Sequence, residues 1–262
     1  MLPLADAWSS VARNYVRYIL PGFEPAARAL VALAGVEPGS EVLDIGCGPG
    51  TASLIARENG AVRVVGVDIS MGMITVARER AHGLGGIEFI EGNAMDLPVR
   101  DQAFDVVISN FGVIFAPEPT RAVNEMARAL KPGGRVAFTA WLPGGTTAGY
   151  YQVVGQHLPT APTQDDHFNW GDPERAAAWL SPRFASITTT RIDVPFLAPS
   201  AEAAWEQLRS STGRVGASYP PLSETARLRM DRDLVQYFQG FRQPDSTICW
   251  PREALVILAQ RT

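Results

Sequence analysis

A glycine-rich segment, VLDIGCGPG, carries the residues whose types and spacing favour a particular chemistry. A short apolar run delivers Asp44, and the chain then passes through Gly46, Gly48 and Gly50 into a segment with helical character. Glycine is required where backbone approaches a ligand closely or adopts a positive φ. The free N–H groups of a helix start, next to the carboxyl end of a strand, form the usual ligand position of open α/β sheets.

The spacing of this loop separates two classes of nucleotide cofactor. Dinucleotide sites use G-x-G-x-x-G to seat a pyrophosphate, whereas this loop reads G-x-G-x-G, and Asp44 stands two positions before Gly46. A carboxylate there would repel a pyrophosphate, but it suits an ammonium group such as that of an amino-acid moiety. The loop therefore favours S-adenosylmethionine over NAD.

Two later segments supply groups for the rest of such a cofactor. Asp68 ends a β-branched run, and its carboxylate can accept two hydrogen bonds from a ribose diol, a feature that NAD sites share. In GNAMDLP, the Asn93 side-chain oxygen can accept from an adenine amine, and the Ala94 N–H can donate to a ring nitrogen. Met95 or Ile69 can pack on the face of that ring.

Strands and helices that alternate from residue 41 onward must position these groups. The patterns predict strands at residues 41–45, 62–67, 87–92, 104–109, 135–141, 185–194 and 254–259. Between the early strands they predict helices at residues 51–59, 70–82 and 120–130, with a later one at 173–180. This alternation is typical of an α/β fold with a parallel sheet covered by helices on both faces.

The regions outside this alternation define the expected domain organisation. Residues 1–40 read as two N-terminal helices, 6–20 and 25–34. The methyl-donor-binding core is expected at residues 41–195 and 247–262, with an irregular segment at 142–172 that is rich in Gly, Pro, Thr and aromatic residues. Residues 196–246 read as a helical substrate cap, because they are inserted between the last two strands.

Composition limits the class of protein. The 262 residues include 46% hydrophobic and 19% charged side chains, which is typical of globular proteins, and the net charge of −4 argues against nucleic acid as a partner. The two cysteines exclude a disulfide framework, and no apolar run approaches the roughly 18 residues of a membrane span. With no signal peptide visible, we expect a cytoplasmic protein that acts on a small molecule, in an oligomeric state left open.

Several segments taken together resemble a known family. Five segments, in their order along the chain, resemble class I S-adenosylmethionine-dependent methyltransferases, more narrowly the ubiquinone/menaquinone-biosynthesis-like (methyltransferase type 11) family. They are VLDIGCGPG, VVGVDIS, EFIEGNAMDLPV, FDVVISNFGVIFAPEP and ALKPGGRVAFTAW. The resemblance covers about residues 40–141. It implies a Rossmann-like, seven-stranded, mostly parallel sheet whose last strand is antiparallel, and methyl transfer to an acceptor held by the cap.

The resemblance also implies roles for individual residues. Asp44, Gly46 and Gly48 would line the methionine part of the cofactor, and the helix carrying Tyr15 would lie over it. Asn93 stands where the family usually has Asp, and its amide keeps the acceptor oxygen. Cys47 is interpreted mainly as a small packing residue within the loop, and Asn110 would sit near the reactive end of the cofactor. The expected cofactor contacts are Tyr15, Asp44, Gly46, Cys47, Gly48, Asp68, Ile69, Met73, Asn93, Ala94, Met95 and Asn110.

The sequence shows no obvious catalytic constellation, and the expected reaction explains why. The methyl on a sulfonium is already activated, so the protein chiefly aligns the reactants, which can lower a barrier by about 7–11 kcal/mol. No metal is expected. If the acceptor is a hydroxyl, His167 is the preferred candidate for a general base. Aromatic residues that could line an apolar acceptor pocket are Tyr150, Tyr151, Phe168, Trp170, Trp205 and Tyr219.

Three other functions share parts of this sequence pattern. An NAD(P)-dependent reductase of the short-chain type needs Tyr-x-x-x-Lys, but the single lysine is Lys131, with Ala127 four positions before it. A nucleic-acid methyltransferase usually shows [DN]PP[YF] after the fourth strand, where this chain reads SNFGVIF. A cofactor-binding protein without methyl transfer stays open, as do the identity of the acceptor and whether O, N, C or S is methylated.

Overall fold

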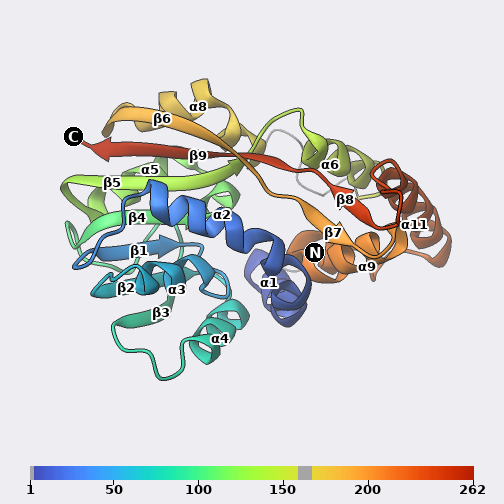
Figure 1. Ribbon diagram of the computed structural model, residues 1–262, viewed down its shortest axis with the longest axis horizontal. Helices are drawn as coiled ribbons and strands as arrows, with labels where there is room; N and C mark the ends of the chain where they lie inside the picture. The colour runs from blue at the N-terminus through green and yellow to red at the C-terminus, as the bar shows by residue number, and fades with distance from the viewer. Residues whose placement is uncertain (1–2, 159–166) are drawn as a thin grey trace.

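The computed structural model describes residues 3–158 and 167–262, and a seven-stranded sheet forms their centre (Figure 1). The strand order is β3-β2-β1-β4-β5-β9-β6. The strands are β1 (Glu41–Ile45), β2 (Arg63–Asp68), β3 (Ile87–Glu91), β4 (Phe104–Asn110), β5 (Leu130–Trp141), β6 (Phe184–Asp193) and β9 (Glu253–Arg261). Only β9 is antiparallel to its neighbours β5 and β6 within this sheet. The predicted Rossmann-like sheet, with its last strand antiparallel, is confirmed.

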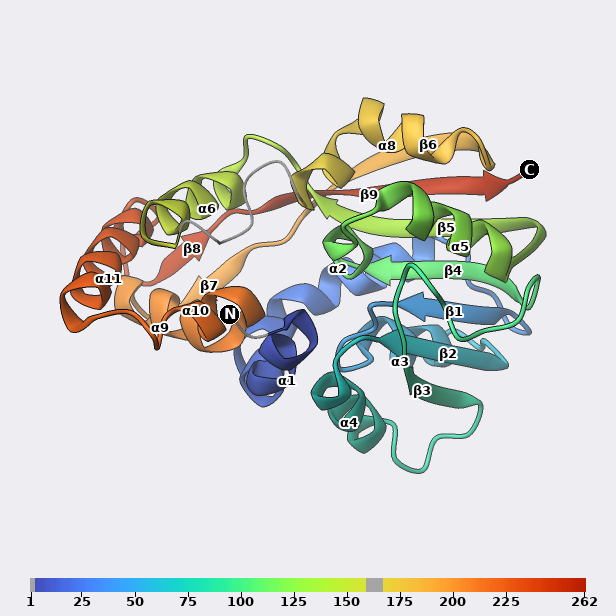
Figure 2. The ribbon, with the colours of Figure 1, turned by 180° about the vertical axis from the view of Figure 1, so that it is seen from behind.

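Helices cover both faces of the sheet, as the alternating pattern predicts. The helices of the core are α2 (Leu20–Leu33), α3 (Thr51–Glu58), α4 (Met71–Arg80), α5 (Pro119–Ala129) and α8 (Pro173–Leu180). α2 and α3 lie in front of the sheet in Figure 1, whereas α5 and α8 lie in front of it in Figure 2. The central strands are buried on both sides, which explains why β1, β2 and β4 read as nearly continuous apolar runs.

The N-terminal region differs from the two separate helices expected from the sequence. α1 (Leu4–Asn14) passes through a π-helical turn, η1 (Tyr15–Ile19), directly into α2, and Pro25 lies inside α2. Proline removes one helical hydrogen bond and normally interrupts a helix. Here the apolar face of α2 packs on the sheet, and this burial outweighs the lost bond. π-helical turns are rare and occur frequently at functional sites.

A second lobe lies beyond the carboxyl ends of the parallel strands (Figure 2). Its elements are α6 (Thr146–His157), β7 (Phe196–Ala198), α9 (Ala201–Ser211), α10 (Gly213–Ser218), α11 (Glu224–Gln239) and β8 (Ile248–Trp250). β7 and β8 pair as an antiparallel two-stranded sheet, a feature the sequence analysis did not predict. We call this lobe the cap; it contains the residues 196–246 that read as an insertion, together with α6.

The interpretation of residues 142–172 as irregular is wrong for two parts of that segment. Thr146–His157 forms α6, and Phe168–Gly171 forms a 3₁₀ turn, η3. The sequence of α6 contains Thr, Gly, Tyr and Val, which are weak helix formers. The helix instead depends on tertiary packing, because Tyr150 and Val154 are buried and Tyr150 contacts Phe238 of α11. Residues 159–166 lie outside the described residues.

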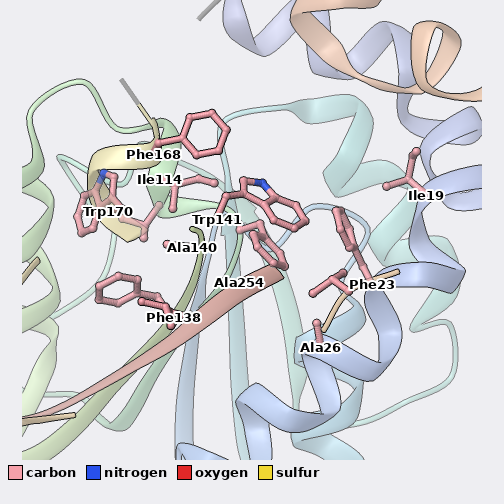
Figure 3. Close-up of a cluster of buried hydrophobic side chains, with 14 of the residues drawn as sticks. Ile19, Phe23, Ala26, Ile114, Phe138, Ala140, Trp141, Phe168, Trp170 and Ala254 are labelled. Atoms are coloured by element: carbon pink, nitrogen blue, oxygen red, sulfur yellow. The ribbon is translucent and has the colours of Figure 1, made fainter. Parts of the chain in front are cut away.

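Aromatic packing joins the sheet, the N-terminal helices and the cap. Figure 3 shows Phe23 of α2 near Trp141 at the end of β5. Phe111 stacks on both rings, with centroids 5.1 Å from Phe23 and 4.2 Å from Trp141. This cluster fixes the N-terminal helices at the edge of the sheet where β4 and β5 end. No helix in the described segments is long and apolar enough to cross a bilayer.

Candidate cofactor and acceptor site

The strand order reverses between β1 and β4, and the loops that follow these two strands touch each other. Gly46 has a φ of +64°, and a Cβ placed on it would lie 2.6 Å from Gly112 Cα. A Cβ on Gly112 would in turn lie 2.5 Å from the Gly46 carbonyl oxygen. Such a reversal creates a crevice outside the carboxyl ends of the strands, where ligands of open α/β sheets bind.

A cavity of about 400 Å³ lies at this point, between the sheet, the N-terminal helices and the cap. Ten of the twelve expected cofactor contacts line it, the exceptions being Asp44 and Cys47. Gly48 has a φ of +53° and nothing within 4 Å of a Cβ position, so this part of the loop leaves open space at the cavity wall. The open loop, the acidic strand end and the Asn93 segment together fit an adenine nucleoside that carries an amino acid.

Asp44 and Cys47 are buried beside the cavity rather than on its surface. Asp44 is completely buried and accepts a 2.6 Å hydrogen bond from the Ser53 hydroxyl, while its Oδ1 has no hydrogen-bond partner among the described residues. Cys47 packs against Phe89 and the apolar side of α4, and burial raises the pKa of its thiol well above the usual range. The carboxylate of Asp44 can attract a bound cation electrostatically without touching it, whereas Cys47 has a packing role.

Asp68 is the acidic group that reaches the cavity. Its Oδ2 accepts from Gly48 N at 2.8 Å, and its Oδ1 accepts from Ser70 N at 2.8 Å. Each oxygen keeps a second lone pair, so the carboxylate can still accept from a diol. Burial raises the pKa of Asp68 to about 6 and that of Asp44 to about 7, and the negative charge of Asp68 adds to the rise at Asp44.

These raised pKa values predict a pH-dependent affinity for the cationic cofactor. Because Asp68 ionises at about pH 6 in the folded protein, affinity for S-adenosylmethionine should rise about tenfold between pH 5 and 7.5. The folding stability of the apoprotein should change with pH in the opposite direction. The unfolded carboxyl ionises near pH 4, so the stability that the protonated folded form contributes is lost as pH rises through 6.

Titration calorimetry at several pH values measures both the affinity and its slope. Asp68→Asn is the matched control, because the amide does not ionise and should remove most of the slope. An equal slope in the wild type and in Asp68→Asn would contradict this prediction.

Side chains after β3 and β4 are held by local hydrogen bonds. Asn93 Oδ1 accepts from Met95 N at 2.9 Å, which folds the segment so that Ala94 lines the cavity. Asn110 Oδ1 accepts from the Thr139 hydroxyl at 3.1 Å, and that hydroxyl accepts from Phe111 N at 2.7 Å. These bonds hold Phe111 at a φ of +56°.

The far end of the cavity is aromatic. Of the six aromatic residues proposed from the sequence, Tyr150 and Tyr151 line it, whereas the other four are packed elsewhere. Sequence reasoning missed Trp8, Phe115, Trp141 and Trp250 as lining residues. The described residues bring these side chains together from opposite ends of the chain, so no local spacing could reveal them.

His167 does not line the cavity. Its ring is 1% exposed and contacts Phe115 and Tyr151, two residues that do line it. Burial, and secondarily Arg214, lower the pKa of His167 to about 4. A proton acceptor in this position would have to act through Tyr151 rather than touch the acceptor, so the structure adds no support for His167 as the base.

The strand order, the glycine loop and the acid at the end of β2 define the class of Rossmann-like methyltransferases. Residues 43–138 match the methyltransferase domain family designated type 11. An uncharacterized protein from Mycobacterium tuberculosis is 29% identical over 249 residues, covering 90% of this chain and 87% of that protein. A demethylmenaquinone methyltransferase from Clavibacter sepedonicus is 42% identical over 109 residues, 42% of each chain.

Solved structures agree on the fold. The YcgJ protein from Bacillus subtilis has a TM-score of 0.63 at 21% identity, covering 90% of this chain and 97% of that one. A geranyl diphosphate methyltransferase in complex with S-adenosylmethionine has a TM-score of 0.55 at 18% identity, covering 91% and 85%. Residues 43–138 are therefore similar to the type 11 methyltransferase domain, and the protein is an S-adenosylmethionine-dependent methyltransferase.

Proposed function

We propose that this methyltransferase acts on a small organic acceptor with an apolar body, bound between the cofactor and the cap. One observation carries the proposal: the same cavity is lined by Gly48 and Asp68 at one end and by aromatic side chains of the cap at the other. A donor and an acceptor can therefore meet in one cavity. The compared proteins named for demethylmenaquinone and geranyl diphosphate support a small-molecule acceptor.

In this proposal the residues of the chain bind, orient and exclude water. Asp68 would accept from the ribose, Asn93 and Ala94 would meet the adenine, and Gly48 would admit the amino-acid part. When bound, the cofactor supplies a methyl group on a positively charged sulfur. In-line displacement requires the acceptor atom opposite that sulfur, and the walls formed by Phe115 and Tyr151 would hold it there.

Binding and turnover test this proposal separately. S-adenosylhomocysteine at one hundred times its Kd should add about 2.7 kcal/mol of stability. This corresponds to a rise in Tm of about 5–10 °C for a chain of this length. NADH at the same concentration should leave Tm within about 1 °C. The reverse ranking of the two ligands, measured by differential scanning fluorimetry, would refute the cofactor site.

Turnover is measured as formation of S-adenosylhomocysteine when a panel of apolar acceptors is supplied with the methyl donor. Release that depends on the acceptor, together with a methylated product in the mass spectrum, supports the proposal. Cofactor binding with no release across acids, phenols and amines would favour a protein that binds the cofactor without transferring its methyl group.

Other expectations from the sequence belong to the same proposal. The net charge of −4 supports a small molecule rather than nucleic acid as the acceptor. Both cysteines, Cys47 and Cys249, are free, which supports a reducing compartment such as the cytoplasm.

A further inference from the structure

Arg252 connects β8 to β9 and lines the acceptor end of the cavity, although its side chain is almost completely buried. Only 3% of the residue is exposed. Four aromatic rings surround the guanidinium, at 4.9 to 5.5 Å from its central carbon to the ring centroids, and they belong to Phe23, Trp141, Phe196 and Trp250. Rings at this distance stabilise a cation through their electron-rich faces, but they do not satisfy its N–H groups.

No acidic side chain balances this charge. Among the ion pairs of residues 3–158 and 167–262, none includes Arg252. Its Nε donates to the Val194 carbonyl at 2.8 Å, and its Nη2 has no hydrogen-bond partner among the described residues. A buried cation without an acidic partner costs free energy.

The ionisable groups that act on Arg252 are phenols. Tyr15 and Tyr151 are the side chains whose charge would affect it, and burial raises the pKa of both, so both are neutral near pH 7. Burial also lowers the pKa of Arg252 to about 9, which leaves it charged at neutral pH. The cavity therefore has an acidic pole at Asp68 and a basic pole at Arg252, and Tyr15 is influenced by both.

We propose that Arg252 binds a carboxylate of the methyl acceptor, so that the acceptor is an organic acid with a flat, apolar body. This inference rests on the proposed function. With Nε engaged by Val194, the two Nη groups are the donors left for a carboxylate, which a planar guanidinium can bind through two parallel hydrogen bonds. Arg252 is the only Lys or Arg among the described residues that line the cavity, so it balances one negative charge but not a phosphate dianion.

Matched pairs of acids and amides test the charge requirement directly. The probes are benzoate, cinnamate and 1-naphthoate, each compared with its uncharged amide, on protein saturated with S-adenosylhomocysteine at pH 7.5. We expect the wild type to bind at least one acid tenfold or more tightly than its amide in titration calorimetry. Absence of a preference in all three pairs overturns the inference.

Two substitutions connect such a preference to this residue. Arg252→Gln removes the charge and keeps a donor for the Val194 carbonyl, whereas Arg252→Met keeps an apolar side chain of similar reach. Both should reduce the preference for the acid to less than twofold. Arg191→Gln is the control, because Arg191 is an exposed arginine paired with Glu253, and it should keep the wild-type ratio. A preference that survives in Arg252→Gln overturns the inference.

Stability and cofactor binding distinguish this role from a purely structural one. Removing an unpaired buried charge should shift the Tm of the apoprotein by less than about 4 °C, because the relieved charge offsets the lost hydrogen bond and ring contacts. Binding of S-adenosylhomocysteine should change less than threefold in both variants. If the wild type does not bind S-adenosylhomocysteine, the proposed function fails, whereas cofactor binding without a preference for acids removes only the role of Arg252.

Discussion

Replacing Asp68 with alanine should weaken binding of S-adenosylmethionine by about tenfold to one hundredfold. Asp68 lines the cavity at the end of β2 and is positioned by Gly48 N and Ser70 N. Loss of a hydrogen bond to a charged group costs about 1.5–3 kcal/mol, which gives this range of affinity. The charge of the sulfonium and ammonium adds to the effect, because Asp68 is the acidic group that faces the cavity. Titration calorimetry at pH 7.5 measures it.

Two further variants separate ligand binding from loop support. Asp68→Asn keeps an oxygen for one N–H of the loop and removes the charge, so it should show most of the loss with little change in Tm. Asp44→Asn changes a carboxylate that the cavity does not expose and keeps an acceptor for Ser53, so its effect on affinity should be smaller. A larger loss in Asp44→Asn than in Asp68→Asn would reverse the two roles.

The sequence predicted the part of the fold in which local pattern and tertiary environment agree. The β-branched run that ends at Asp68 forms a strand buried on both faces, and the helix expected at residues 70–82 forms as α4, where Ser70 accepts a capping hydrogen bond from Met73 N. The glycine loop was predictable for the same reason. Positive φ at Gly46 and Gly48 is a local requirement, and glycine meets it at low cost.

Features that depend on distant packing were not predictable. α6 has weak helix formers and exists because Tyr150 packs between α11 and β8, which lie about one hundred residues away in the chain. Arg252 looks like an ordinary residue in a turn between two apolar runs. Its surroundings come from α2, β5, β7 and β8, so no spacing in the sequence marks it as buried beside the cavity.

Gly46→Ala should destabilise the protein by about 2–5 kcal/mol. Placing alanine at a φ of +64° costs about 1–2 kcal/mol, and forcing a methyl group into packed surroundings adds about 1–3 kcal/mol. The atom it meets, Gly112 Cα at 2.6 Å, belongs to backbone held by β4, so no side chain can turn away. Thermal unfolding should show a fall in Tm on the order of 10 °C.

Gly48→Ala is the matched control in the same loop. Its φ of +53° imposes a similar backbone cost, but nothing lies within 4 Å of the new methyl group, so destabilisation should stay near 1–2 kcal/mol. The methyl would instead enter the cavity beside Asp68 and weaken binding of S-adenosylhomocysteine. Gly46→Ala should therefore act mainly on stability and Gly48→Ala mainly on affinity. Equal losses of stability in the two variants would mean that glycine is required at position 46 because of backbone strain, and not because the loop after β1 contacts the loop after β4.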